Sequence, residues 1–334
     1  MQRKWQKKII ISKIIVHKRR FFYMKKRYSL LFFIIIFLTF SCKKIDAPAY
    51  LIISADDLKI STANFNEEHE LDKELDNEEL AILRQQDFTE VLISLNGREL
   101  GYWHLPCTIP LMPDYTKDNN IRITPCTRVP NVTLNSVPYH FLLSEERILT
   151  LEKEGEYRLS DLNFKYAPTV KVEVLETFIQ TSSFKPRDTI YTASMEIYKE
   201  ENVSMGRIAL EDSVDFFNVV LDVGDNVYVR DVYTKMKVRR YWEMNYYCDM
   251  GEITTYLEFP SPLGTLPQQD MIVLPASKSW KKIYIDITEI MSMAAGSSDK
   301  ISLRLGMRGL KKSENQNAYF YFKNVKLITM LAPY

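Results

Sequence analysis

Histidine and glycine are scarce in this sequence, which has four histidines and ten glycines among 334 residues. It contains neither His-Glu-x-x-His nor Cys-x-x-Cys, so the usual spacing of zinc ligands is missing. It also lacks a Gly-x-Ser-x-Gly nucleophile elbow, a phosphate-binding glycine loop and a dinucleotide fingerprint. We therefore predict no metal site, no cofactor and no catalytic residues. A glycosidase remains as an alternative, because its two facing carboxylates need no fixed spacing along the chain.

Acidic residues are absent from the first 41 residues, which contain eleven Lys or Arg. An apolar run from Leu30 to Phe40 follows and ends just before Cys42, which is the pattern of an export signal with its cleavage site. The run of eleven residues is too short to cross a bilayer core, which needs about 20 helical residues. We predict a signal peptide over residues 1–41, and Met24 is an alternative start that would give it ordinary proportions.

The tetrapeptide Thr39-Phe40-Ser41-Cys42 resembles a lipobox, the site where lipoprotein signal peptidase cuts before a lipidated cysteine. This resemblance implies lipidation of Cys42 and a tether over residues 42–48. Several acyl chains on one cysteine give durable membrane anchoring. The other reading is an ordinary signal peptide that has a cysteine near its end.

Without the leader, residues 42–334 carry 33 basic and 43 acidic side chains, a formal net charge of −10. This charge disfavours nucleic acid as a partner, because phosphates are neutralised by clustered Lys and Arg. The remaining 293 residues are enough for two packed cores. The other cysteines are Cys107, Cys126 and Cys248. Cys107 and Cys126 are a candidate disulfide with Cys248 buried and free, although spacing alone does not establish pairing.

Short β-rich segments separated by turns predict an all-β chain. Asn96-Gly97 between the β-rich runs Thr89–Leu95 and Arg98–Leu105 is the strongest local signal, because this dipeptide is typical of tight hairpins. Six prolines between residues 106 and 138 argue against long helices in the following segment.

The pattern changes near Pro168, where Val170–Val174 alternates apolar and charged residues with a period of two. Further short strand candidates follow at regular spacing, without the intervening helices of a parallel sheet. We predict two β-sandwich domains, over residues 49–168 and 169–334.

Several segments resemble uncharacterised lipoproteins of Bacteroidota that pair an immunoglobulin-like domain with a galactose-binding-like jelly roll. In the first half the resemblance lies in Asn96–Gly101 and the proline-rich strands after it. In the second half it lies in Glu243–Cys248, Trp280–Ile287 and Phe320–Ile328. The resemblance implies an Ig-like sandwich followed by a jelly roll, and it implies no activity.

An aromatic cluster in the second half includes Trp280 and a run from Tyr241 to Tyr247. Alternation along a strand places Tyr241 and Tyr247 on one face together with a glutamate and an asparagine. The opposite face then holds Trp242, Met244, Tyr246 and Cys248, which we interpret as core. Tyr241 and Tyr247 are the candidate glycan-binding residues, because flat rings stack on sugar faces.

Asp188-Thr189-Ile190 and Asp212-Ser213-Val214 resemble the periplasmic O-glycosylation sequon of this phylum, which makes Thr189 and Ser213 candidate acceptors. Surface-exported lipoproteins of these bacteria carry an acidic run behind the lipidated cysteine. This chain has Lys43-Lys44-Ile45-Asp46 instead, so the face of the outer membrane stays undecided.

The preferred interpretation is a non-catalytic lipoprotein, anchored to the outer membrane, that acts as an accessory subunit with an envelope protein partner. The alternatives are a carbohydrate-binding lipoprotein that captures glycan and a carboxylate-dependent glycosidase.

Overall fold

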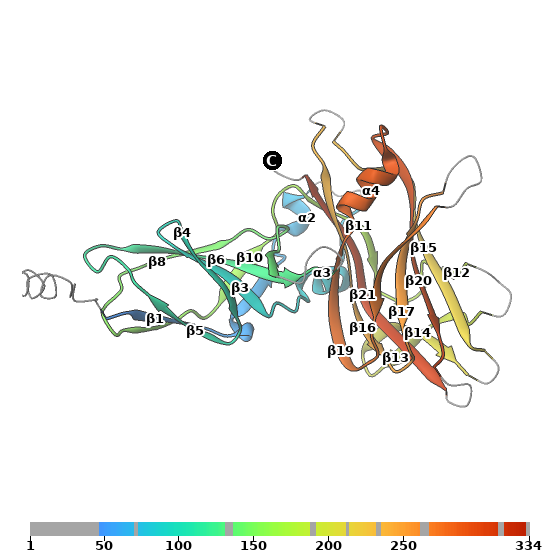
Figure 1. The fold of residues 1–334 in the computed structure, drawn as a ribbon, viewed down its shortest axis with the longest axis horizontal. Coiled ribbons are helices and arrows are strands. Elements are labelled where there is room, and N and C mark those ends of the chain that lie inside the picture. Colours follow the sequence, from blue (N-terminus) through green and yellow to red (C-terminus); the bar gives the residue numbers. More distant parts are fainter. Residues whose placement is uncertain are drawn as a thin grey trace, which may run out of the picture. The chain divides into compact units, whose positions relative to one another are not determined.

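Strands make up most of the chain that the structure describes (Figure 1). The structure is a computed structural model, and it describes residues 47–69, 73–130, 136–187, 192–211, 214–231, 235–260, 267–312 and 317–331. The predicted signal peptide and Cys42 lie outside these residues. The chain from Pro48 onward forms one compact unit. In the described ranges no helix combines the length and the apolar character needed to cross a bilayer.

The first half of this unit contains short strands and short helical segments. Their bounds are β1 Ala49–Ile53, η1 Ala55–Asp57, β2 Leu58–Ser61, α2 Phe65–Glu68, α3 Asn77–Arg84, β3 Glu90–Leu95, β4 Arg98–His104, β5 Cys107–Leu111, β6 Asn119–Arg128, β7 Ser136–Pro138, β8 Glu145–Leu149, β9 Glu156–Arg158 and β10 Leu162–Lys165. The strands pair in the orders β5-β1-β9, β10-β2 and β4-β3-β6-β7, and β8 also pairs with β6.

The predicted hairpin is confirmed, since Asn96 and Gly97 connect the paired strands β3 and β4. Their φ angles are 52° and 80°. A two-residue turn with positive φ at both positions matches the right-handed twist of the strands it joins, and glycine adopts it without steric cost. Apolar side chains such as Leu51, Val91 and Ile123 alternate inward from these strands into a first hydrophobic core.

The second half contains longer strands. Their bounds, with one helix, are β11 Val170–Glu176, β12 Phe184–Pro186, β13 Met195–Glu200, β14 Val203–Leu210, β15 Phe216–Tyr228, β16 Val238–Cys248, β17 Ile253–Glu258, β18 Gln268–Leu274, β19 Ser277–Asp286, α4 Thr288–Ala295, β20 Lys300–Leu310 and β21 Ala318–Leu331.

These strands form a two-layer sandwich (Figure 1). One sheet has the order β13-β14-β21-β16-β19, with β11 also paired to β21, and we call it the front sheet. The other has the order β12-β15-β20-β17-β18. A second hydrophobic core lies between them and includes Trp242, Phe320 and Leu305. The prediction of an all-β chain built from β-sandwiches is confirmed.

The candidate disulfide between Cys107 and Cys126 is not formed, and both cysteines are free, as is Cys248. Cys107 packs partly against the first core. Ile121 and Ile123 face the first core, and Cys126 is three positions after Ile123. Because side chains alternate along a strand, the side chain of Cys126 lies on the opposite face of β6 from that core. Burial raises the pKa of both Cys126 and Cys248 to about 12, which keeps these thiols protonated.

Candidate functional site

Strand β16 separates its side chains between the second core and the outer face of the front sheet. The core set is the predicted one: Trp242, Met244, Tyr246 and Cys248. The outer set is Tyr241, Glu243, Asn245 and Tyr247, so alternation assigned both faces correctly. The two halves of the outer set nevertheless have different surroundings.

Tyr241 is not displayed, and the prediction that it binds glycan is wrong. It is 3% exposed and belongs to the first core, where its ring lies 5.0 Å from Phe141 and 6.2 Å from Tyr139. The strands of the first half, which we call the first sandwich, therefore cover this end of the front sheet. Alternation along one strand cannot reveal such a cover, because it comes from residues about a hundred positions earlier in the chain.

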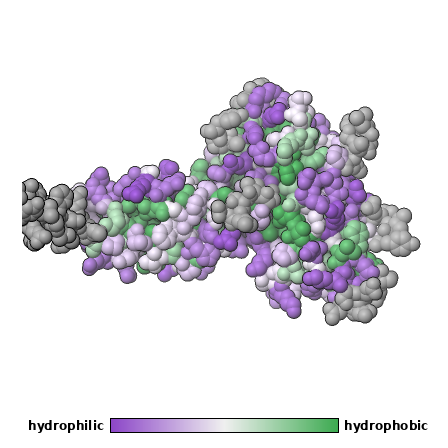
Figure 2. All heavy atoms as spheres, viewed as in Figure 1, coloured by the Kyte–Doolittle hydropathy of each residue, from purple (hydrophilic) through white to green (hydrophobic). Residues whose placement is uncertain are grey.

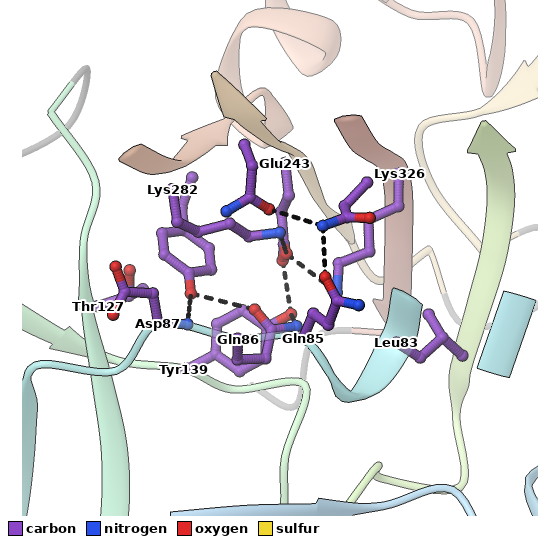
Figure 3. A network of polar contacts seen from close by, with 12 residues as sticks. Leu83, Gln85, Gln86, Asp87, Thr127, Tyr139, Glu243, Lys282 and Lys326 are labelled. Carbon is purple, nitrogen blue, oxygen red and sulfur yellow. Dashed lines mark hydrogen bonds and ion pairs between the residues drawn. The ribbon is translucent and has the colours of Figure 1, made fainter. Parts of the chain in front are cut away.

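The covered part of the face contains a buried carboxylate between two lysines (Figure 3). Tyr139 donates its hydroxyl hydrogen to Glu243 Oε1 at 2.5 Å. Glu243 Oε2 lies 3.2 Å from Lys326 Nζ and 3.4 Å from Lys282 Nζ. Burial, together with the charge of Lys326, lowers the pKa of Lys282 to about 7. One carboxylate thus balances one of the two buried ammonium groups.

The loop after α3 extends this network to neighbouring strands (Figure 3). Tyr284 on β19 donates to Gln86 Oε1 at 3.1 Å and accepts from the backbone N–H of Asp87 at 3.2 Å. Asn324 on β21 donates to Gln85 Oε1 at 2.6 Å. These bonds fix the boundary between the covered and the open part of the front sheet.

Four aromatic side chains cross the open part, one from each of four strands. In strand order they are Tyr198 of β13, Tyr321 of β21, Tyr247 of β16 and Trp280 of β19. Successive ring centroids are 5.6, 5.9 and 6.2 Å apart. Trp280 is 36% exposed and the three tyrosines are half-buried. We call this set the aromatic row.

Arg207 of β14, the strand between β13 and β21, fills the gap in the row. Its guanidinium carbon lies 5.4 Å from the ring centroid of Tyr198 and 4.9 Å from that of Tyr319. It pairs with Glu196 at 3.0 Å and Glu211 at 3.3 Å. Arg207 is therefore held by two carboxylates and two rings.

Lys323 stands at the other end of the row. Its ammonium nitrogen lies 4.2 Å from the ring centroid of Trp280, within the range of a cation–π contact. Burial lowers the pKa of Lys323, while Glu200 acts in the opposite direction. Tyr321 precedes Lys323 by two positions, so both side chains lie on the same face of β21.

The row offers flat apolar rings beside hydroxyl, amide and ammonium groups. Aromatic rings with polar edges suit ligands that are apolar on one face and hydrogen-bonding at the rim. Among the described residues, His, Cys, Asp and Glu form no cluster that could hold a metal ion. A hollow of about 760 Å³ near the other end of the front sheet is lined by Lys171, Glu173 and Arg240, among others, and Glu173 and Arg240 pair with each other.

Of the two predicted glycan-binding residues, Tyr247 lies in the row, next to Trp280 of the predicted aromatic cluster. Sequence reasoning missed Tyr198 and Tyr321. The signal for Tyr321 was present, since Tyr319, Tyr321 and Lys323 alternate with core phenylalanines along β21. Tyr198 has no such local signal. Thr189, Ser213 and Cys42 lie outside the described residues.

The face of the molecule in Figure 2 carries hydrophilic residues with hydrophobic patches between them. Such a surface agrees with the apolar side chains being gathered in the two cores.

No protein-family model matches this chain, and no curated protein matches it in sequence. Solved structures with a similar fold include the xylan-binding CBM22-1 domain of Paenibacillus barcinonensis Xyn10C, at 10% identity and a TM-score of 0.34 over 49% of this chain and 97% of that one.

A family 11 carbohydrate-binding module of the Clostridium thermocellum cellulase Lic26A-Cel5E is similar at 15% identity and a TM-score of 0.33, over 48% of this chain and 95% of that one. A structure described as a carbohydrate-binding module of the β-sandwich superfamily is similar at 10% identity and a TM-score of 0.34, over 85% of this chain and 99% of that one.

Proposed function

We propose that the second sandwich is a glycan-binding module and that the aromatic row is its binding site. The observation that carries this proposal is the row itself, in which side chains of four strands align across the open part of one sheet face. Large aromatic side chains left half-exposed in a line are costly to keep in water unless a ligand covers them.

The physical basis of binding is stacking of sugar rings on aromatic faces with hydrogen bonds at the rim. The rings have two side-chain torsions each and are held by their neighbours, so little conformational entropy is lost on binding. Asn245 lies at the border of the row and bonds to Asn324 at 3.2 Å, which places amide groups within reach of a glycan hydroxyl.

Calorimetric titration of the purified unit with a panel of soluble polysaccharides tests the proposal. We expect at least one glycan to bind, and Trp280→Ala or Tyr247→Ala to weaken that binding by about tenfold or more, which is about 1.4 kcal/mol. Tyr102→Ala is the matched control, because Tyr102 is 50% exposed on β4, away from the row. Equal losses in all three variants, or no heat with any glycan, would refute the proposal.

We further propose, from the leader and Cys42, that the protein is a lipid-anchored outer-membrane protein of a Bacteroidota-like cell. In that setting the module holds glycan at the cell envelope, without catalysis of its own, for a protein partner that processes or imports the sugar. The absence of catalytic motifs in the sequence supports the non-enzymatic part of this proposal.

A further inference from the structure

We infer that the glycan bound by the aromatic row carries carboxylates, and that Lys323 is the residue that selects them. This inference rests on the glycan-binding function proposed above. The ligand class is therefore the hexuronic-acid polysaccharides.

The two cations of the row have different surroundings. Arg207 is paired with Glu196 and Glu211, and the hydroxyl of Tyr319 also donates to Glu211 at 2.9 Å. Lys323 has no ion pair within the described part of the chain, and Glu200 acts on it only through its field. Lys323 is therefore the ammonium group of the row that is open to a ligand carboxylate.

Lys323 is held in place and partly dehydrated at the same time. Its ammonium lies on the Trp280 ring at 4.2 Å, and burial lowers the pKa of Lys323. A cation that has lost water without gaining a carboxylate gains more from an incoming anion than a fully hydrated lysine does. A sugar that contacts Trp280 must share the ring with this ammonium, which favours a sugar that also carries a negative charge.

The charges around the row are distributed unevenly. Trp280 lies on the edge strand β19, two positions after the exposed residue Lys278, so the two side chains share one face of the strand. The Tyr198 end carries the exposed carboxylates Glu196 and Glu200. A negatively charged sugar is thus attracted to the Trp280 end and repelled from the Tyr198 end, which gives the ligand one preferred placement along the row.

The test compares polygalacturonate with the same polymer after reduction of its carboxylates to alcohols. We expect the wild-type unit to bind the acidic polymer at least tenfold more tightly, and to lose this difference as salt is raised, because partly exposed charges are screened. Lys323→Met keeps an unbranched side chain of similar shape and removes the charge. It should abolish the difference between the two polymers.

Lys185→Met is the matched control, because Lys185 is exposed on β12 of the opposite sheet. It should keep the full preference for the acidic polymer. Circular dichroism confirms that each variant is folded.

Three results would overturn the inference. If the reduced polymer or another neutral glycan binds as tightly as polygalacturonate, and binding still depends on Trp280, the glycan-binding function stands and the carboxylate preference is wrong. Tighter, Lys323-dependent binding of a sulfated dextran would assign the site to sulfate instead. If no glycan binds at all, the proposed function itself fails.

Discussion

Glu243 is the counter-charge of the two buried lysines under the first sandwich. Its carboxylate is fully buried and faces the ammonium groups of Lys326 and Lys282. The pKa of Lys326 is raised by Glu243 despite its burial, whereas the pKa of Lys282 falls to about 7. Because one carboxylate compensates one ammonium, Lys326 keeps its proton and Lys282 is the cation that burial penalises.

Replacing Glu243 with Gln should destabilise the protein by about 3–5 kcal/mol, because it leaves the buried ammonium group of Lys326 without its counter-charge. Urea unfolding of the purified unit measures this loss. The control is Glu196→Gln, since Glu196 is an exposed partner of Arg207 and should change stability by less than about 1 kcal/mol. A double variant that also carries Lys326→Met should recover part of the loss. Equal stability of Glu243→Gln and the wild type would contradict this account.

At the scale of elements, strand β19 and the loop after α3 meet beside Lys282. The charge of Lys282 is sensitive to pH because its pKa is about 7. Lys282 lies in β19 beside Lys326 and Glu243, and the charge of Asp87 in the loop also acts on it. Tyr284, two positions further, bonds to the same loop. The junction therefore depends on the charge state of Lys282.

We expect the free energy of unfolding to rise between pH 7 and about pH 8.5. The range ends at about pH 8.5 because the cysteine thiols of the unfolded chain ionise there and add a second pH dependence. The pKa of Lys282 is lower in the folded protein than the value of 10.5 from which it is shifted. In this interval the unfolded chain binds more protons than the folded one, so stability increases as pH rises.

The measurement is the urea midpoint of unfolding at several pH values. Lys282→Met should make the midpoint nearly independent of pH in this interval, because it removes the titrating group. Lys185→Met on the opposite sheet is the control and should keep the slope. A wild-type midpoint that stays flat or falls from pH 7 upward would contradict the lowered pKa of Lys282.

The strands themselves were largely predictable, and the site was not. Period-two alternation identified the core side of β16, and the Asn96-Gly97 dipeptide identified the hairpin between β3 and β4. The aromatic row depends on strands that are neighbours in space and distant in sequence, since β21 lies between β14 and β16. Tyr198 and Trp280 are therefore the two ends of one row only because of the sheet topology, which no linear spacing encodes. Tyr241 was misassigned for the same reason, because its cover comes from Phe141 and Tyr139.

At the scale of the whole molecule, the two hydrophobic cores are separate, but the first core includes side chains from the second half of the chain. Tyr241, Tyr284, Ile328 and Met330 all pack in the first core although they belong to strands of the front sheet. The chain from Pro48 onward consequently forms one compact unit. The first sandwich thus limits the open part of the front sheet to the half that contains the aromatic row.

The membrane anchor is the remaining whole-molecule prediction, and it concerns how this unit is presented to glycan. Acyl chains contribute about 0.8 kcal/mol per buried methylene, so the several chains of a lipoprotein cysteine should hold the protein at the membrane. Cells that express the full chain should incorporate labelled palmitate, and the protein should enter the detergent phase on phase separation. Cys42→Ala should lose both properties.

Cys107→Ala is the control for the anchor, because Cys107 is a free cysteine within the folded unit and should not affect labelling. Label that persists in Cys42→Ala would place the lipid elsewhere. A wild-type protein that stays in the aqueous phase would rule out the anchor altogether, and the aromatic row would then have to act on glycan without membrane attachment. With the anchor in place, tethering raises the effective concentration of the row near polymers at the envelope, so that even a weak single-site affinity retains a long chain.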